Sequence, residues 1–255
     1  MQALWHLICD QGRKATECNP VLRQYLETRV HAHAGFEQAL AANLAQELSA
    51  QASNVDLNAW FLSLIKANPA IATGAAADIQ HLVAVNPACP DELTAFLSFR
   101  GIQAVQAYRL AHTLWQEGDI QSAVLLQNWA ANHWSIDIHP AARLGIRLFV
   151  DHGIGLVIGE TAVVEDDVSL WHGVTLGSTL NESGDRHPKI RRGALLCAGS
   201  TVLGNIEVGE RAIVAANAVV LKPVLAGVVV AGTPAKVVSN VPAVLETLKP
   251  QSQGQ

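Results

Sequence analysis

The chain has 255 residues, half of them hydrophobic, which is enough for one large domain or two smaller ones. The formal net charge of −5 and the pI near 6.0 give no reason to expect a nucleic-acid partner, which would favour a basic stripe. No apolar run approaches the roughly 20 residues that would cross a bilayer, and the first segment lacks the order of a signal peptide. The four cysteines are scattered without metal-ligand spacing, which favours a reducing compartment, so we expect a cytoplasmic protein.

Apolar residues recur at helical spacing from residue 1 to about residue 135. This pattern predicts six to eight helices. One of them is expected to start at an N-cap, Asn54 or Ser53, and to stop near Pro69. By itself this half of the chain indicates no chemistry.

After residue 135, aliphatic residues recur every six positions in two runs. Their members are Ile138, Leu144, Val150, Leu156, Ala162, Val168 and Val174, and then Ile190, Leu196, Val202, Val208, Val214 and Val220. Hexapeptide periodicity is typical of a parallel β-helix, in which three short strands and three tight corners make one coil. We expect each aliphatic residue to point inward and to stack on the residue one coil away. A β-sandwich would instead show period-two alternation and hairpin signals, which are absent.

The segment 177–188 interrupts the two runs, and it is polar and contains glycine. An insertion between repeats predicts a projecting loop, and in solenoids such loops often lie on the binding face. A tolerated surface insertion is the alternative, but it does not account for Asp185, Arg186 and His187 occurring together. We therefore expect this loop to serve function.

Five motifs stand out in the second half of the chain. They are Asp137-Ile-His-Pro-Ala-Ala142, Asp151-His152-Gly-Ile-Gly155, Ile158-Gly-Glu-Thr-Ala-Val163, Val174-Thr-Leu-Gly177 and Gly184-Asp-Arg-His-Pro-Lys-Ile190. Together they resemble the hexapeptide acyltransferases, and more narrowly the bacterial serine acetyltransferases. The resemblance covers almost the whole chain. It implies an α+β multidomain protein, with an N-terminal α-helical domain followed by a left-handed parallel β-helix. The implied domains are a helical oligomerisation and substrate-loop domain at 1–135, an acetyltransferase β-helix at 136–238 and a tail at 239–255.

The resemblance implies transfer of an acetyl group from acetyl-CoA to the hydroxyl of L-serine, giving O-acetyl-L-serine for cysteine biosynthesis. The hydroxyl must lose its proton as it attacks, and a neutral imidazole with an ordinary pKa of about 6.5 is suited to take it. His152 matches the catalytic histidine of the family, and Asp137 matches its acidic partner. Such a carboxylate would fix the tautomer of the ring and stabilise the imidazolium that forms.

Five residues match the substrate-binding positions of the family. Asp151 resembles the residue that receives the hydroxyl or amino end of serine, and Arg186 and His187 resemble the pair that binds its carboxylate. In the loop containing Asn86 and Pro87, the family usually carries an aspartate before the proline. Asn86 keeps the size but loses the charge, which weakens a hydrogen bond by about 1–2 kcal/mol.

In the family, acetyl-CoA lies in the groove between adjacent β-helices of a trimer, so we expect a homo-oligomer of at least three chains. The helical domain would join two trimers into a hexamer. Lys236 is expected to meet a phosphate of the acyl donor, although a structural role is an alternative for it and for every residue of the next set. The residues implied to contact the pantetheine arm are Gly177, Thr179, Ala198, Gly199, Ala215 and Ala216.

Two other chemistries fit the sequence less well. A ping-pong mechanism would need a cysteine beside a base, and Cys197 has no histidine next to it in sequence. A metal site of the kind found in zinc-dependent β-helix enzymes needs three converging histidines, and the histidine spacing here does not match it. We therefore expect direct attack and no metal.

Three departures from the family pattern bear on function besides Asn86. Ser178 and Leu180 stand where the family prefers glycines, and they could alter the fit of donor and acceptor. The chain ends Gln-Ser-Gln-Gly-Gln255, without the isoleucine that inserts into O-acetylserine sulfhydrylase, so we do not expect that complex. Feedback inhibition by cysteine stays open, because cysteine would use the site beside Asn86.

Three functions remain open at this point. The first is a serine O-acetyltransferase, which the intact His152, Asp137 and Arg186 favour. The second is a specialised O-acyltransferase for another small hydroxy amino acid, which Asn86 and Leu180 favour. The third is a β-helix scaffold without catalysis, and a γ-type carbonic anhydrase is weaker still for want of ligand spacing.

Overall fold

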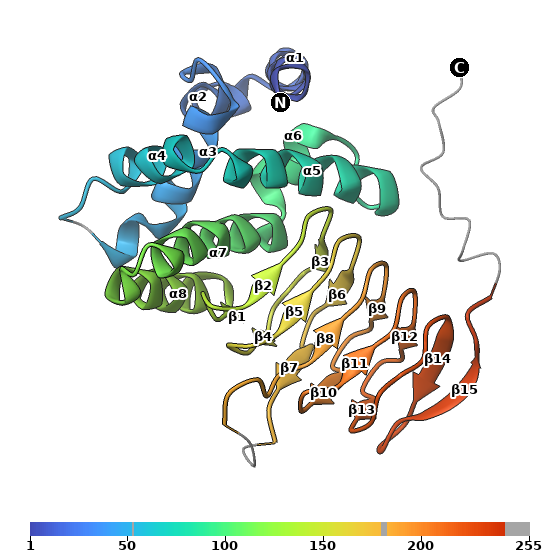
Figure 1. Cartoon of the computed structure of the whole chain (residues 1–255). Helices are drawn as coiled ribbons and strands as arrows, with labels where there is room; N and C mark the ends of the chain where they lie inside the picture. Colours follow the sequence, from blue (N-terminus) through green and yellow to red (C-terminus); the bar gives the residue numbers. More distant parts are fainter. Residues whose placement is uncertain (53, 180–182, 243–255) are drawn as a thin grey trace.

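Helices fill the first part of the chain, as the apolar spacing predicts (Figure 1). The computed structural model describes residues 1–52, 54–179 and 183–242. Its eight α-helices are α1 (Gln2–Cys18), α2 (Arg23–Leu26), α3 (Phe36–Leu48), α4 (Leu57–Ala67), α5 (Ala70–Val85), α6 (Glu92–Ser98), α7 (Arg100–Gln116) and α8 (Ile120–Trp134). No helix in the described part of the chain is long and apolar enough to cross a membrane.

The predicted start of α4 is wrong. Asp56, and not Asn54, is the N-cap, since its side chain accepts a hydrogen bond of 3.0 Å from the backbone nitrogen of Ala59. An N-cap side chain must reach the amide two or three residues further on, and only Asp56 is placed to do so here. The other candidate, Ser53, lies outside the described residues.

After α8 the chain forms a parallel β-solenoid, which confirms the predicted β-helix. The strands are β1 (Ile136–Ile138), β2 (Arg143–Leu144), β3 (Phe149–Asp151), β4 (Leu156–Ile158), β5 (Val163–Val164), β6 (Ser169–Trp171), β7 (Thr175–Gly177), β8 (Lys189–Ile190), β9 (Leu195–Leu196), β10 (Thr201–Leu203), β11 (Glu207–Val208), β12 (Ile213–Val214), β13 (Val219–Val220), β14 (Val228–Ala231) and β15 (Lys236–Asn240).

Up to β13, every third strand falls in the same sheet, so the solenoid has three faces. The β1 sheet has the order β1-β4-β7-β10-β13, the β2 sheet has β2-β5-β8-β11, and the β3 sheet has β3-β6-β9-β12-β14-β15. All pairs are parallel except β14 with β15, which closes the far end as an antiparallel hairpin. The polar interruption of the repeats becomes the loop between β7 and β8.

The thirteen predicted hexad residues line the solenoid core, where all but the half-buried Leu144 are buried. The expected stacking of Ile138 on Leu156 is wrong, however. Ile138 lies beside Ile158, twenty residues further on, whereas Ile158 lies beside Leu176, eighteen residues further on. The corner between β3 and β4 therefore contains two additional residues. The hexad pattern does not reveal this two-residue shift in register, because alternate residues of each strand point inward. Ile136, two residues before Ile138, is therefore the residue beside Leu156.

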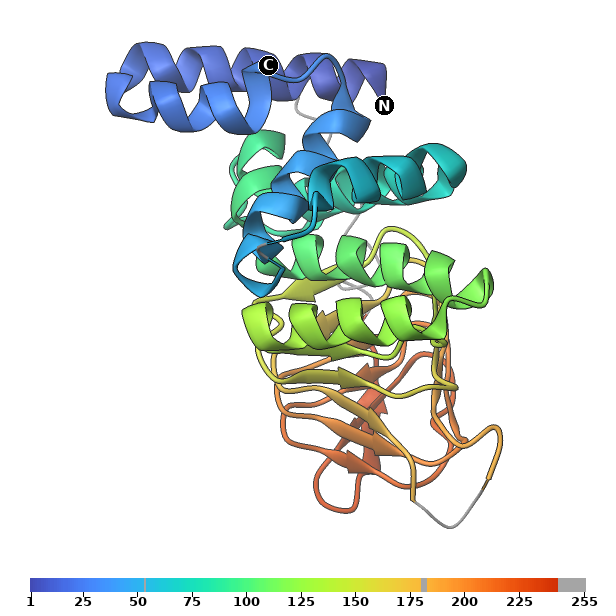
Figure 2. The same ribbon diagram turned by 90° about the vertical axis from the view of Figure 1, so that its left-hand side faces the viewer.

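The helices cover one end of the solenoid in layers. Figure 2 shows α7 and α8 side by side on the first coil, with α4 and α5 above them and α1 farthest away. Because α7 and α8 pack against β1, β3 and each other, the helical part and the first coil share one continuous hydrophobic core. The apolar end of the solenoid, which would otherwise be open, is thereby covered.

A buried ion pair fastens the helices to the first coil. Asp78 of α5 is 1% exposed and accepts hydrogen bonds from Arg109 (2.6 Å) and Gln106 (3.0 Å) of α7 and from the backbone nitrogen of Leu148 (3.0 Å). Arg109 also donates to the backbone oxygen of Gly145 (3.1 Å). Both charges are thus paired and hydrogen-bonded, which a buried ion pair needs if it is to be tolerated.

The change Asp78→Ala should destabilise the protein severely, because it leaves the Arg109 guanidinium buried without its counter-charge. We expect a loss of about 3–5 kcal/mol in the free energy of unfolding, measured by urea denaturation. The matched control is Asp119→Ala, which removes only the exposed N-cap of α8 and should cost about 0.5–2 kcal/mol. Equal losses in the two variants would contradict the structural importance of the pair.

Candidate active site

The predicted site residues lie on two different edges of the solenoid. At one edge, here called the His152 edge, each coil turns from the β3 sheet into the β1 sheet, as in the corner between β3 and β4. At the next edge, here called the Arg186 edge, each coil turns from the β1 sheet into the β2 sheet, as between β4 and β5 or β7 and β8. One strand of the β1 sheet separates the two edges within a chain.

His152 occupies the corner that contains the two additional residues. Its backbone has φ +54°, in the left-handed region that is uncommon for residues other than glycine, and its side chain is 71% exposed. The ring nitrogen Nε2 lies 3.7 Å from Oδ2 of Asp151. The ring of His172, one coil further along, lies 6.0 Å away in an edge-to-face arrangement. The imidazole is therefore presented to solvent.

Asp137 lies on β1, where its side chain is half-buried beside α8. Its Oδ1 accepts a hydrogen bond of 2.7 Å from Nε2 of Gln127. Among the described residues, Gln127 and not His152 is its hydrogen-bond partner. The expected role of Asp137 as the residue that orients His152 therefore stays a prediction.

Arg186 and His187 lie on the Arg186 edge, at the base of the loop between β7 and β8. Arg186 donates to Glu160 (2.5 Å) and to the backbone oxygen of Gly184 (3.1 Å). His187 is only 7% exposed and is held by Thr161, whose hydroxyl lies 2.9 Å from its Nδ1. The structure brings these two predicted carboxylate-binding residues together, but on the opposite edge from His152.

The electrostatics of this corner keep the His187 imidazole neutral. Burial, followed by the neighbouring Arg186 guanidinium, lowers the pKa of His187 below its ordinary value of 6.5. The hydrogen bond from Arg186 in turn lowers the pKa of Glu160, which stays ionised. A neutral imidazole beside a paired guanidinium can donate a hydrogen bond to an anion without adding a second full charge.

Asn86 is the C-cap of α5, and Pro87 follows it on the surface. The Asn86 side-chain oxygen accepts a hydrogen bond of 3.0 Å from the backbone nitrogen of Ala88, which fixes its rotamer. An aspartate can accept the same bond. The structure therefore offers no local reason for asparagine in place of the carboxylate that the family pattern predicts.

The residues expected to contact the acyl donor are divided between the two edges. Ala198, Gly199, Ala215 and Ala216 lie on the His152 edge, and Lys236 lies exposed at its far end, just after Ala235, whose backbone nitrogen bonds Val219. Gly177 and Thr179 instead lie on the Arg186 edge. Of the loop residues that depart from the family pattern, Ser178 is half-buried and Leu180 lies outside the described residues.

Glycines stack along the His152 edge. A Cβ atom on Gly155 would lie 3.5 Å from the Cα of Gly173, and one on Gly173 would lie 3.4 Å from the Cα of Gly199. All three have positive φ, between +68° and +76°. This edge therefore presents bare backbone to whatever packs against it, which suits a long, thin substrate arm.

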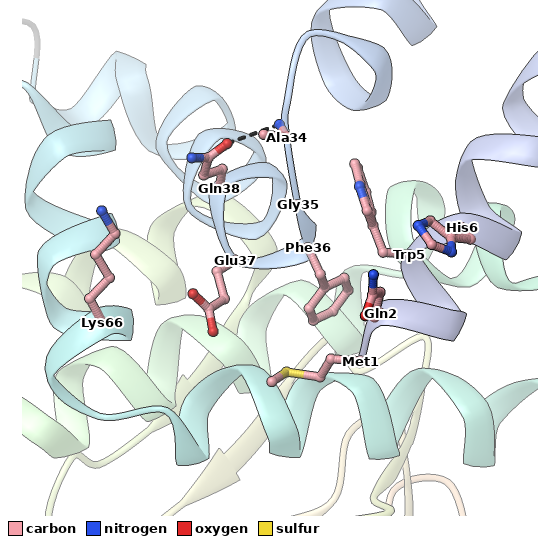
Figure 3. Close-up of a pocket in the computed structure, with 10 residues that line it drawn as sticks. All are labelled: Met1, Gln2, Trp5, His6, Ala34, Gly35, Phe36, Glu37, Gln38 and Lys66. Carbon is pink, nitrogen blue, oxygen red and sulfur yellow. Dashed lines mark hydrogen bonds between the residues drawn. The ribbon is translucent and has the colours of Figure 1, made fainter.

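Three further features of the structure bear on the alternatives to a histidine base, namely a metal site, a cysteine nucleophile and a site elsewhere on the chain. The part of the chain that the structure describes contains no cluster of three or more His, Cys, Asp or Glu side chains that could hold a metal ion. Burial raises the pKa of the Cys197 thiol, which makes it a poorer nucleophile. A pocket of about 380 Å³ between α1, α3 and the end of α4 contains none of the predicted site residues (Figure 3).

Four residues that touch the site were not predicted from the sequence. His172 follows His152 by twenty residues, the length of the first coil, so the register would have indicated it. Glu160 and Thr161 belong to the motif Ile158-Gly-Glu-Thr-Ala-Val163, but their partners lie across an insertion. Gln127 is on a helix, and no sequence signal relates it to Asp137.

A parallel β-solenoid of hexapeptide repeats, capped by helices and bearing an exposed histidine in an extended corner, defines the class of hexapeptide acyltransferases. Comparison with known proteins gives the family. The family model described as "Serine acetyltransferase, N-terminal" matches residues 4–107. Serine acetyltransferase 2 of Arabidopsis thaliana is 44% identical over 236 residues, which cover 92% of this chain and 73% of that protein.

Two solved structures agree with this assignment. The serine acetyltransferase of Brucella abortus strain S19 in complex with coenzyme A is 41% identical, with a TM-score of 0.89, and the match covers 95% of this chain and 97% of that one. A serine acetyltransferase in complex with cysteine is 39% identical, with a TM-score of 0.90 and coverage of 94% of each chain. This chain belongs to the serine acetyltransferase family.

Proposed function

We propose that the protein transfers the acetyl group of acetyl-CoA to the hydroxyl of L-serine, with His152 as general base. The neutral imidazole takes the hydroxyl proton while the serine oxygen attacks the thioester carbonyl carbon. The carbon–sulfur bond then breaks, and the proton passes to the thiolate of coenzyme A. The observation that carries the proposal is the exposed His152 ring in the extended β3–β4 corner of a serine acetyltransferase chain.

Asp137 is proposed to orient and stabilise the protonated His152. It lies on β1, and the corner holding His152 leads into β4, which pairs with β1. The bond from Gln127 holds the Asp137 carboxylate in place. Asp151, close to Nε2 of His152, is proposed to receive the hydroxyl or amino end of serine.

The acyl donor and the acceptor both have support from relatives. The Brucella relative binds coenzyme A, and another relative binds cysteine, an amino acid that differs from serine only in its side-chain atom. In this chain, the glycine-lined His152 edge and Lys236 at its end are proposed to hold the pantetheine arm and a phosphate. Arg186 and His187 are proposed to bind the carboxylate of serine.

These roles require more than one copy of the chain. His152 and Arg186 lie at opposite ends of the strands of the β1 sheet, so one chain cannot place both beside the same small substrate. We therefore propose a trimer in which the His152 edge of one copy meets the Arg186 edge of the next. The helical domain, 1–135, would join two trimers, and the solenoid domain, 136–238, would carry the site. The tail, 239–255, lies largely outside the described residues, so the expectation about its missing isoleucine stays a prediction.

A second function is favoured by one observation, the neutral Asn86. A site without the usual carboxylate would bind the amino group of serine less strongly, so a different small hydroxy amino acid is the alternative acceptor.

The four free thiols of the chain agree with the predicted reducing, cytoplasmic compartment.

Serine-dependent release of coenzyme A should be lost when the base is removed. We expect His152→Ala to lower kcat by about 10²–10⁴-fold, because general base catalysis is typically worth that much. The measurement is thiol titration with acetyl-CoA and L-serine, L-homoserine or no acceptor. The matched control is His33→Ala, which removes a half-buried histidine of the helical domain and should leave the rate unchanged. Release that persists in His152→Ala would contradict the proposed base, and release with L-homoserine alone would select the second function.

Restoring the carboxylate at position 86 should strengthen serine binding. We expect Asn86→Asp to lower the KM for serine by about 5–30-fold, as a charge-assisted hydrogen bond replaces a neutral one, without changing the KM for acetyl-CoA. The control is Asn19→Asp, a comparable change at an exposed helix cap. An unchanged KM for serine, with a gain for another acceptor, would show that Asn86 selects a different substrate.

A further inference from the structure

Among the described residues, the segment Gly159-Glu160-Thr161, at the corner between β4 and β5, makes the side-chain hydrogen bonds that join the two carboxylate-binding side chains to the solenoid. Glu160 contacts Arg186, and Thr161 contacts His187. These three residues are here called the corner segment. Its contacts assign a definite chemical form to the imidazole that would face the substrate.

The hydroxyl of Thr161 has all of its hydrogen-bonding capacity in use. It accepts from the backbone nitrogens of Arg186 and His187, both at 3.0 Å. Backbone N–H groups can only donate, so they occupy the two lone pairs of the oxygen. Nδ1 of His187, at 2.9 Å, is an acceptor beside the single hydroxyl hydrogen, and the Asp185 carboxylate is a second one.

The backbone nitrogen of Thr161 determines which ring nitrogen of His187 is protonated. It lies 3.2 Å from Nδ1 of His187 and can only donate. Since Nδ1 accepts from this N–H, it must be the unprotonated nitrogen, and the proton of the neutral ring must be on Nε2. Nε2 has no hydrogen-bond partner among the described residues. It is not fully enclosed either, because the fully enclosed atoms without a partner do not include it. The Nε2–H group is thus an available donor.

The charged groups around His187 also favour the neutral ring. Arg186, Lys189 and His139 face it with positive or neutral nitrogen atoms, and the Glu160 carboxylate opposes them. Glu160 is already paired with Arg186 at 2.5 Å, which reduces its pull on the imidazole. Lys189 is itself held by the backbone oxygens of Thr161 (3.0 Å) and His187 (2.6 Å).

Arg186 is held in place but keeps N–H donors for a further ligand. A guanidinium has five N–H donors, and Glu160 and the backbone oxygen of Gly184 engage one each. The remaining donors suffice for a carboxylate. Gly159 completes the arrangement, since a Cβ atom there would lie 2.1 Å from Cδ2 and Nε2 of His187, so only glycine lets the ring lie against this corner.

We infer that Thr161 and Glu160 are positioning residues for the acceptor, and that His187 serves as a neutral Nε2–H donor to its carboxylate. This inference rests on the proposed function, because it assigns the form of the same binding pair. Thr161 fixes the tautomer, Glu160 fixes the guanidinium, and Gly159 provides the space for the ring. His187 neither gives nor takes a proton in the reaction.

The test compares Thr161→Val with Thr161→Ser. Valine has the shape of threonine but removes the hydroxyl, which leaves two backbone amides without a partner and leaves Nδ1 with the Thr161 backbone N–H alone. We expect the KM for serine to rise about tenfold or more, while the KM for acetyl-CoA stays unchanged. The KM for serine should also become more dependent on pH below 7 than in the unchanged protein, because the freed ring can now be protonated. Serine at position 161 should restore both properties.

The matched control is Thr73→Val on α5, where the hydroxyl bonds only the backbone oxygen of Pro69 and is exposed. It should leave both KM values unchanged. An unchanged KM for serine in Thr161→Val, or an equal rise in both KM values, would overturn the positioning role.

A second readout does not depend on activity. In protein labelled with ¹⁵N-histidine, the signals of His187 are assigned by their loss in His187→Gln. The unchanged protein should show an unprotonated Nδ1 and a protonated Nε2, and Thr161→Val should show a mixture of forms. A protonated Nδ1 in the unchanged protein would overturn the inference even if serine acetylation is observed. Absence of serine-dependent acetylation with the expected tautomer would instead count against the proposed acceptor.

Discussion

The carboxylate of Asp78 is shared between the Arg109 guanidinium and the backbone amide of Leu148, and it ties the helices to the first coil of the solenoid. Nearby, the Tyr108 hydroxyl donates to the backbone oxygen of Ala142 (2.5 Å), and burial raises its pKa to about 12, so it stays protonated as a donor. These bonds fix α5 and α7 on the end of the β-solenoid. Because α8 packs on α7, Gln127 is held where it reaches Asp137. The geometry of the predicted catalytic pair thus depends on a helical layer that carries none of its reacting groups.

The solenoid places chemistry at its edges because its interior is filled by stacked aliphatic side chains. Strands of two or three residues leave little outward surface, whereas each corner presents backbone and projecting side chains. Two of the corners that depart from the regular repeat carry predicted site residues. The β3–β4 corner is two residues longer and presents His152, and the β7–β8 corner is a loop that ends in Arg186 and His187. Since these corners lie on different edges, an active site that uses both must be assembled from neighbouring copies.

The strand positions and the inward residues could be predicted from the sequence because they follow a local period of six. The two-residue slip after Val150 could not, since strands bury alternate residues and either phase leaves an aliphatic residue inside. Arg186 lies in the loop that the interruption of the repeats predicts, and His152 lies at a corner whose position the sequence did not indicate. Their partners Gln127, Glu160 and Thr161 were missed, because each contact joins elements whose register only the folded chain sets. The role of Asp78 could not be predicted from the sequence, because it lies in an alanine-rich helix and its partner Leu148 is 70 residues away.

Subunit complementation tests the central claim, that one active site uses the His152 edge of one copy and the Arg186 edge of the next. His152→Ala and Arg186→Ala chains, each inactive alone, would be co-expressed in equal amounts and purified as mixed oligomers. If the site is shared, random assembly gives about a quarter of the sites two intact halves, so about a quarter of the serine-dependent activity should return. If each chain contains a complete site, every site keeps one defect, and mixed oligomers that stay inactive would contradict the account.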